Sequence, residues 1–184
     1  LERLGSKWWK VALDTQRPYR WNLRRLDPGR TLDIGCGIGR NLVNLPPGSV
    51  GVDRNVNSIN VVREHGLTAY SVDEFPESVD ARLGYFDTIL FSHVIEHVDP
   101  EASRSLVADY LPYLDANGKL IVICPQERGY ASDATHVKLY DFDDLGSLVA
   151  DVGFRVTRSF SFPFPRVFGK LFTYNEFVVV ATRN

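Results

Sequence analysis

The sequence contains no methionine, only two cysteines and no long hydrophobic run. A helix that crosses a bilayer needs about 20 apolar residues, so we expect no membrane partner. No signal-peptide pattern opens the chain, and we therefore expect a cytoplasmic protein whose native start lies outside these residues. In a reducing compartment Cys36 and Cys124 are expected to be reduced, small core residues and not a disulfide.

An excess of charge of one sign is also missing. The 21 basic and 23 acidic side chains leave a net charge of −2, which gives no broad positive field to attract nucleic acid. The chain is 184 residues long and 44% hydrophobic, enough for one sizeable core and short for two domains. We therefore expect a single domain without a nucleic-acid partner.

Apolar segments of strand length alternate with segments of helical periodicity along most of the chain. The almost wholly apolar run 86–92 is typical of a parallel strand covered on both faces, and Pro125 ends another such run. We expect strands at 30–34, 49–53, 67–72, 86–92, 119–124, 154–162 and 174–182. We expect helices at 38–44, 56–65, 100–114, 141–151 and 167–171, a loop at 125–140, and two short helices within 6–26 broken at Pro18.

Three alternate glycines, Gly35, Gly37 and Gly39, follow the first apolar strand and the acidic residue Asp33. Glycine permits positive φ and close approach of a ligand, so this turn indicates a nucleotide-binding loop. A dinucleotide fingerprint would require glycine where the chain has Arg40, which weakens a nicotinamide oxidoreductase. Asp53, twenty residues after Asp33, ends a second apolar run and offers a carboxylate to the hydroxyls of a ribose.

Four segments, taken in order, resemble the class I S-adenosylmethionine (SAM) dependent methyltransferases: Leu32–Gly39, Gly51–Asp53, Phe86–Leu90 and Val94–Val98. The resemblance covers about residues 30–182. It implies an α/β fold, a three-layer sandwich whose seven-stranded, mostly parallel sheet has the order 3-2-1-4-5-7-6 with the last strand antiparallel. We expect one methyltransferase domain over 1–184, with a helical lid at 1–28 and a catalytic core at 29–184.

The same resemblance implies SAM as cofactor and S-adenosylhomocysteine (SAH) as product. The three glycines would lie under the methionine part, Asp53 would hold the ribose, and Asp33 would support the loop or meet the ammonium through water. After the third strand, Asp73 and Phe75 would flank the adenine, although a plain core role for Phe75 is equally open. The expected cofactor-binding residues are Asp33, Gly35, Gly37, Gly39, Asp53, Asp73, Phe75 and Ser92.

Three of the four histidines, His93, His97 and His136, fall at the carboxyl ends of strands that should be neighbours. Histidine titrates near neutral pH and is the common base for taking a proton from an alcohol. We therefore predict these three as catalytic candidates, with His65 as a bystander.

A divalent metal is a second possibility for the same residues, because His93, Glu96 and His97 share one side of a helical turn. Some small-molecule O-methyltransferases, including the ubiquinone-pathway branch, are similar in binding magnesium through an acidic-x-x-Glu-His set. Here His93 replaces the acid, and nitrogen ligands suit zinc or iron better than magnesium. The predicted metal ligands are His93, Glu96, His97, Asp133 and His136; purely structural roles are the third possibility.

We expect methyl transfer to a hydroxyl of a polar small molecule, with a sugar or oligosaccharide favoured. The alternatives are another small-molecule class, such as a quinone, a phenol or a nitrogen acceptor, and a non-catalytic SAM-binding partner or sensor. Amino-methylating nucleic-acid enzymes carry an Asp/Asn-Pro-Pro-Tyr-like run where this chain has 92–95. The basic and aromatic segment 163–173 suggests a homodimer surface.

Overall fold

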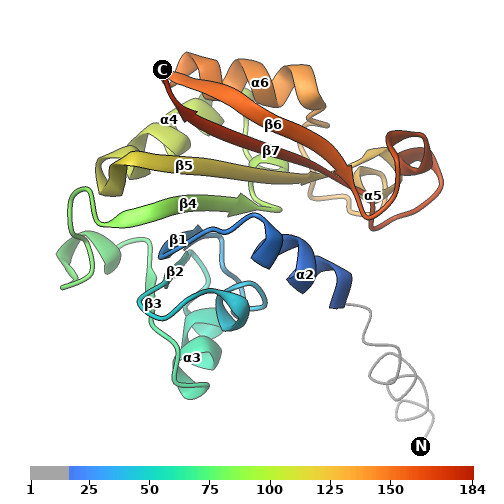
Figure 1. Ribbon diagram of the computed structural model, residues 1–184. Helices are drawn as coiled ribbons and strands as arrows, with labels where there is room; N and C mark the ends of the chain where they lie inside the picture. The colour runs from blue at the N-terminus through green and yellow to red at the C-terminus, as the bar shows by residue number, and fades with distance from the viewer. Residues whose placement is uncertain (1–16) are drawn as a thin grey trace, which may run out of the picture.

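The computed structural model describes residues 17–184, whose strands form one seven-stranded sheet in the order β3-β2-β1-β4-β5-β7-β6 (Figure 1). Neighbouring strands are parallel except that β7 runs antiparallel to both β5 and β6. The predicted fold and strand order are therefore confirmed. The strands are β1 (Thr31–Ile34), β2 (Val50–Asp53), β3 (Ala69–Ser71), β4 (Phe86–Ser92), β5 (Leu114–Pro125), β6 (Phe154–Phe162) and β7 (Glu176–Arg183).

Helices cover both faces of this sheet, as Figure 1 shows. On one face, α4 (Pro100–Tyr110) and α6 (Phe142–Asp151) pack their apolar residues against the central strands. On the other face, α2 (Arg17–Arg25) contributes Leu23 to a cluster with Leu90 and Ile121, and α3 (Val56–Glu64) packs Ile59 and Val62 near β2 and β3. Burial on both faces explains why β4 and β5 read as continuous apolar runs.

Short helical turns complete the chain, and several of them carry site residues. The loop expected at 125–140 contains α5 (Glu127–Tyr130), and the helix expected at 38–44 shortens to a single turn. These turns are η1 (Leu42–Asn44), η2 (Phe75–Glu77), η3 (Ile95–His97), η4 (Leu111–Tyr113) and η5 (Arg166–Lys170).

The strand expected to begin at residue 119 begins at Leu114, because Asn117-Gly118 forms a bulge within β5 and not a turn before it. Phe86 pairs with Leu114 and Thr88 pairs with Lys119, so the register of β4 and β5 shifts between them. A Cβ on Gly118 would lie 2.5 Å from Cδ1 of Leu114, which explains why glycine occupies the bulge.

Pro18 lies in the first turn of α2, where its missing N–H removes no helical hydrogen bond. The first of the two predicted N-terminal helices, and residues 1–16 of the predicted lid, lie outside the described residues. Within residues 17–184 no helix has the length and apolar character that crossing a membrane requires.

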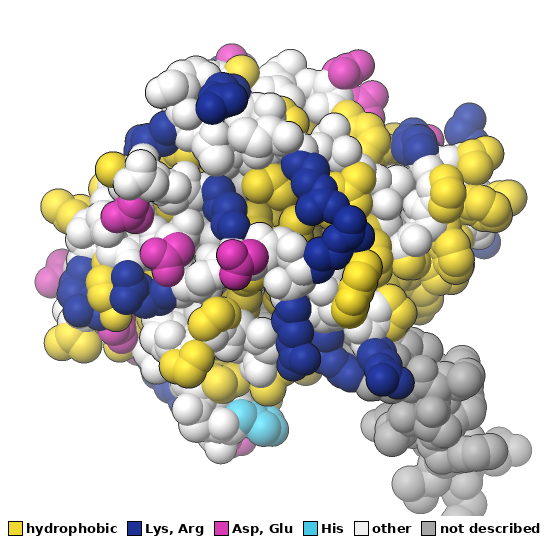
Figure 2. Space-filling view, viewed as in Figure 1, with side chains coloured by type: hydrophobic (Ala, Val, Ile, Leu, Met, Phe, Trp, Pro, Cys, Tyr) yellow, Lys and Arg dark blue, Asp and Glu magenta, His cyan; other side chains and the backbone are white. Residues whose placement is uncertain are grey.

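Exposed hydrophobic side chains gather where α5 and η5 project from the sheet, the yellow area on the right of Figure 2. Val167, Leu171 and Tyr174 are each more than half exposed there. This is the segment that the sequence suggested as a dimer surface, and the homodimer stays a prediction.

Candidate functional site

The predicted site residues converge on one edge of the sheet, where β1, β2 and β4 end and β5 leads into α5. In an open parallel sheet this is the edge at which ligands bind. The glycine loop and Asp53 lie at the ends of β1 and β2, and the turn η3 follows β4. The loop after α5 returns to η3, because the N–H of Val137 donates to the carbonyl oxygen of Glu96 at 2.7 Å.

The three glycines of the loop all adopt positive φ, +71° at Gly35, +52° at Gly37 and +80° at Gly39. A Cβ on Gly35 would lie 2.3 Å from Cγ2 of Val94, whereas a Cβ on Gly37 would meet nothing within 4 Å. Gly35 is thus required by packing, and Gly37 lies beside open space that a ligand can enter.

Asp53 holds this loop directly. Its Oδ2 accepts a hydrogen bond from the N–H of Gly37 at 2.8 Å, and its Oδ1 accepts one from the N–H of Asn55 at 2.8 Å. Each carboxylate oxygen has a second lone pair, so Asp53 can still accept hydrogen bonds from a ribose while it fixes the loop.

Asp33 is fully buried beneath the loop, and neither of its carboxyl oxygens makes a hydrogen bond of good geometry within residues 17–184, the Asn41 amide being near enough only for a weak one. Burial, together with the negative charge of Asp53, raises the pKa of Asp33 to about 8, although the Asn41 side chain lowers it. A buried carboxyl without a partner is costly, and a bound cationic group would supply what it lacks.

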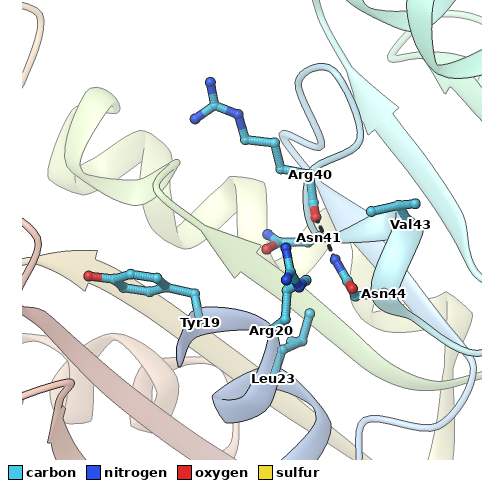
Figure 3. A pocket seen from close by; sticks show the side chains of 7 residues that line it. All are labelled: Tyr19, Arg20, Leu23, Arg40, Asn41, Val43 and Asn44. Atoms are coloured by element: carbon cyan, nitrogen blue, oxygen red, sulfur yellow. Dashed lines mark hydrogen bonds between the residues drawn. The ribbon is translucent and has the colours of Figure 1, made fainter. Parts of the chain in front are cut away.

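A pocket of about 390 Å³ lies between α2 and the segment after the glycine loop (Figure 3). Tyr19 closes one side, and its hydroxyl donates to the carbonyl oxygen of Tyr174 at 2.7 Å. Asn41 lines the pocket, and its amide side chain also interacts with Asp33 as a hydrogen-bond donor, which lowers the pKa of Asp33. Sequence reasoning missed Asn41, for which the only signal is an amide side chain directly after the glycine loop. The lining residues are Tyr19, Arg20, Leu23, Arg40, Asn41, Val43 and Asn44.

The two residues expected at the adenine differ in their surroundings. Asp73 is exposed in the turn after β3, where a ligand can reach it. Phe75 is 1% exposed, and its ring packs edge-on against Tyr113 at 4.9 Å and beside Tyr110. The structure therefore places Phe75 in the core, which removes it from the predicted cofactor contacts. Ser92 is half-buried at the end of β4.

His93 has both ring nitrogens engaged by carboxylates, which argues against its predicted roles as base and metal ligand. Its Nε2 lies 2.9 Å from Oε1 of Glu176, and its Nδ1 lies 3.2 Å from Oε1 of Glu96. Loss of water around the ring opposes its charge, but the hydrogen bonds and charges of Glu176 and Glu96 raise the pKa of His93 to about 10. A charged imidazolium has no lone pair to accept a proton or bind a metal.

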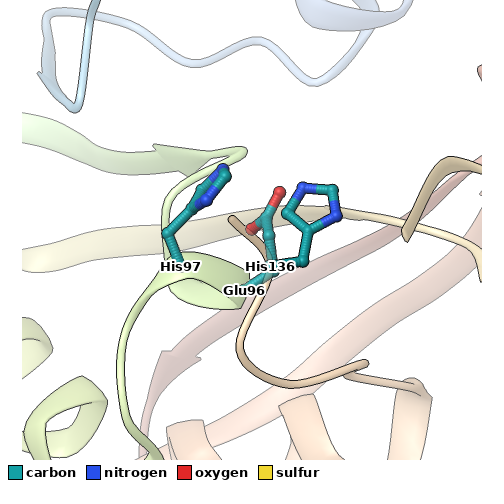
Figure 4. A group of neighbouring side chains, drawn as sticks. All are labelled: Glu96, His97 and His136. Atoms are coloured by element: carbon teal, nitrogen blue, oxygen red, sulfur yellow. The ribbon is translucent and has the colours of Figure 1, made fainter. Parts of the chain in front are cut away.

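Glu96, His97 and His136 form the group that the structure does bring together (Figure 4). One ligating atom from each lies within 4.8 Å of the others. The histidine rings are 4.6 Å apart, and Tyr130 stacks on His136 at 5.3 Å. Glu96 is fully buried, and its Oε1 lies 3.2 Å from Nδ1 of His93, so the charge of that ring already balances its carboxylate in part.

Two other residues fall outside this group. Asp133 was expected as a metal ligand, but its Oδ1 accepts hydrogen bonds from the N–H and the hydroxyl of Thr135, at 2.9 and 2.7 Å. These bonds lower the pKa of Asp133. His65 ends α3 with its Nδ1 2.7 Å from the carbonyl oxygen of Val61, away from the site residues, as expected of a bystander.

A family model described as a methyltransferase domain matches residues 14–159. Among solved structures, a SAM-dependent methyltransferase from Archaeoglobus fulgidus is 21% identical, with a TM-score of 0.72 over 92% of this chain and 95% of that one.

Two further structures have the same fold. Magnesium protoporphyrin IX methyltransferase from Synechocystis, solved with bound SAH, is 17% identical with a TM-score of 0.66, covering 95% of this chain and 87% of that one. A possible histamine N-methyltransferase from Thermotoga maritima is 19% identical with a TM-score of 0.68, covering 97% and 94%. No curated protein sequence matches. Since the family model spans well over half of its length, the chain belongs to the class I SAM-dependent methyltransferase family.

Proposed function

We propose that this protein binds SAM at the glycine loop and transfers its methyl group to a hydroxyl of a polar small molecule. SAM binding is supported mainly by Asp33. Within residues 17–184 its buried carboxyl makes no hydrogen bond of good geometry, and it lies under a loop that is open at Gly37. The ammonium of SAM would supply the missing positive partner, either directly or through water. Asp53 would hold the ribose from the other side of the loop.

Methyl transfer from a sulfonium is a direct displacement, so the protein has to align the acceptor oxygen with the methyl carbon and accept one proton. His97 and His136 are the candidates for the proton, because within residues 17–184 neither ring forms an ion pair with a carboxylate as that of His93 does. A hydroxyl-rich acceptor, with a sugar favoured, suits the carboxylate and the histidine rings of this edge, Glu96, His97 and His136.

A divalent metal is the alternative role for the same group. Glu96, His97 and His136 would supply one carboxylate and two imidazoles, a donor set that suits zinc or iron better than magnesium. Such an ion, when bound, would polarise the acceptor oxygen and ease the loss of its proton. The closeness of the buried Glu96 carboxylate to the two rings supports this possibility.

Calorimetry with SAH tests the cofactor half. Asp53→Ala should weaken SAH binding about tenfold or more, the loss of roughly one hydrogen bond from a charged group. Asp109→Ala, which removes an exposed carboxylate on α4, is the matched control and should bind as the unaltered protein does. No binding at millimolar SAH, or equal binding by both variants, would refute the proposal.

Turnover of a panel of sugars, phenols and amines tests the acceptor half. His97→Ala and His136→Ala should slow hydroxyl methylation by 10²-fold or more if the histidines take the proton, while His65→Ala should not. Loss of activity on chelation would instead favour the metal role. Methylation of amines alone would refute the proposal that the acceptor is a hydroxyl. SAH binding without any turnover would favour a non-catalytic SAM-binding module.

A further inference from the structure

The imidazole of His97 is held by groups that the proposed reaction does not itself use. Its Nδ1 lies 3.1 Å from the hydroxyl oxygen of Thr135 and 3.3 Å from the carbonyl oxygen of the same residue. The Thr135 hydroxyl in turn donates to Oδ1 of Asp133 at 2.7 Å. Two oxygen atoms of Thr135, an exposed loop residue far from η3 in the sequence, therefore converge on one ring nitrogen, and Asp133 holds the hydroxyl.

These contacts determine which nitrogen of His97 carries the proton. A carbonyl oxygen can only accept a hydrogen bond, and the Thr135 hydroxyl has already given its hydrogen to Asp133. Nδ1 must therefore be the donor, which leaves the lone pair of neutral His97 on Nε2. Free histidine favours the opposite form, with its proton on Nε2, so the protein selects the less common tautomer.

His136 shows the same arrangement with an independent partner. Its Nδ1 lies 2.7 Å from the carbonyl oxygen of Tyr130, so this ring also carries its proton on Nδ1. The two neighbouring rings, when neutral, thus each keep their lone pair on Nε2, and both residues lie in one group with the buried Glu96. A second hydrogen bond of this kind fixes both the orientation and the tautomer of a functional histidine.

We propose that Thr135, itself held by Asp133, is a positioning residue that sets His97 with its proton on Nδ1 and its lone pair on Nε2. The use of this lone pair rests on the proposed methyl transfer, in which Nε2 either receives the acceptor's proton or binds a metal. The same orientation serves both roles. Thr135 touches neither the cofactor residues nor the reacting atoms.

Nitrogen-15 NMR of the imidazoles tests the proposal without cofactor, metal or acceptor, about two pH units above the ordinary histidine pKa of about 6.5. In the unaltered chain His97 and His136 should both be mainly protonated on Nδ1. Thr135→Val keeps the shape but removes the hydroxyl, and should shift the tautomer ratio of His97 about fivefold toward the Nε2-protonated form, the effect of one hydrogen bond. His136 should not change.

Two variants complete the test. Thr135→Ser restores the hydroxyl and should restore the tautomer ratio. Ser132→Ala removes a neighbouring hydroxyl, which donates to the carbonyl oxygen of Gly129, and should leave His97 as it is. An unchanged His97 ratio in Thr135→Val, or a His97 protonated mainly on Nε2 in the unaltered chain, overturns the proposal. Because Thr135 lies outside the predicted cofactor residues, Thr135→Val should still bind SAH. Failure of SAH to bind would count against the proposed function, whereas an unchanged tautomer ratio with normal SAH binding would count only against the role of Thr135.

Discussion

Two residues of the predicted cofactor site lack a neighbouring group at a place where a folded protein normally has one. Within the described part of the chain, the buried carboxyl of Asp33 makes no hydrogen bond of good geometry, and no atom lies within 4 Å of the place where a Cβ on Gly37 would be. Buried polar groups are nearly always paired, and an irregular loop of glycines costs conformational entropy. A bound ligand accounts for both features, and each gives a test.

Gly37→Ala should weaken SAH binding while costing about 1 kcal/mol of stability, because alanine is strained at positive φ. Gly84→Ala is the matched control, since Gly84 has a φ of +63° and also has nothing within 4 Å. It should cost the same stability and leave SAH binding unchanged. Calorimetry and urea unfolding measure both quantities; equal SAH affinity of the two variants would contradict the ligand's place over Gly37.

Asp33→Asn should change how the stability of the free protein depends on pH. Because the pKa of Asp33 is about 8 in the folded protein and about 4 in the unfolded chain, the folded state retains a proton that the unfolded state has lost between these values. Linkage then makes the free energy of unfolding fall as pH rises from about 4 to about 8.

The asparagine variant lacks this titration, so its stability relative to the unaltered protein should increase across that pH range and level off above it. Urea unfolding at several pH values measures the difference, with Asp109→Asn as a control for the loss of a surface carboxylate. Parallel pH profiles for Asp33→Asn and the unaltered protein would show that Asp33 is ionised throughout.

Among the elements, α6 depends most clearly on a local signal. Asp141 accepts hydrogen bonds from the N–H groups of Asp143 and Asp144, and the Asp144 side chain accepts one from the N–H of Asp141. This capping box satisfies backbone donors that the helix itself leaves free. It begins a helix whose Leu145, Leu148 and Val149 are buried in the main core.

Asp141→Ala should therefore lower the free energy of unfolding by about 1 kcal/mol, the usual loss for a helix cap. Asp143→Ala removes only an acidic group from the first turn and should cost a few tenths of this. Thermal unfolding followed by circular dichroism measures both. A larger loss for Asp143→Ala than for Asp141→Ala would contradict the capping role.

Across the whole molecule, His93 joins segments that are 83 residues apart in sequence. It follows β4 with a φ of +58°, which is rare for a residue with a side chain, and it lies between Glu96 of η3 and Glu176 of β7. Without the imidazolium, two buried carboxylates would face each other. His93 therefore stabilises the edge of the sheet at which the site is built.

A double-mutant cycle should reveal this coupling. His93→Ala should cost more stability in the unaltered protein than in a Glu176→Gln background, by about 1 kcal/mol, since the His93 side chain is 44% exposed and solvent screens the pair. His65→Ala should cost the same in both backgrounds. Additive losses for His93→Ala and Glu176→Gln would mean that the two side chains do not interact energetically.

Much of the fold was predictable because its signals are local. The alternation of apolar strands and amphipathic helices gave the parallel part of the sheet, and the final pair of strands gave its antiparallel edge. The errors arose where neighbours outside the segment decide: Asn117-Gly118 has the composition of a turn, yet the pairing of Leu114 and Lys119 with β4 on either side includes it in β5 as a bulge. For Phe75 the sequence left a cofactor contact and a core role equally open, and Tyr110 and Tyr113 from a distant part of the chain pack against its ring in the core.

The sequence by itself determined the loop of Gly35, Gly37 and Gly39, because positive φ and close approach depend on the residue type at each position. Only the tertiary structure decided the roles of the histidines. A ring's charge and its free nitrogen depend on the groups that surround it in space, and these come from β7 for His93 and from the loop after α5 for His97. No pattern within residues 92–98 contains Glu176 or Thr135.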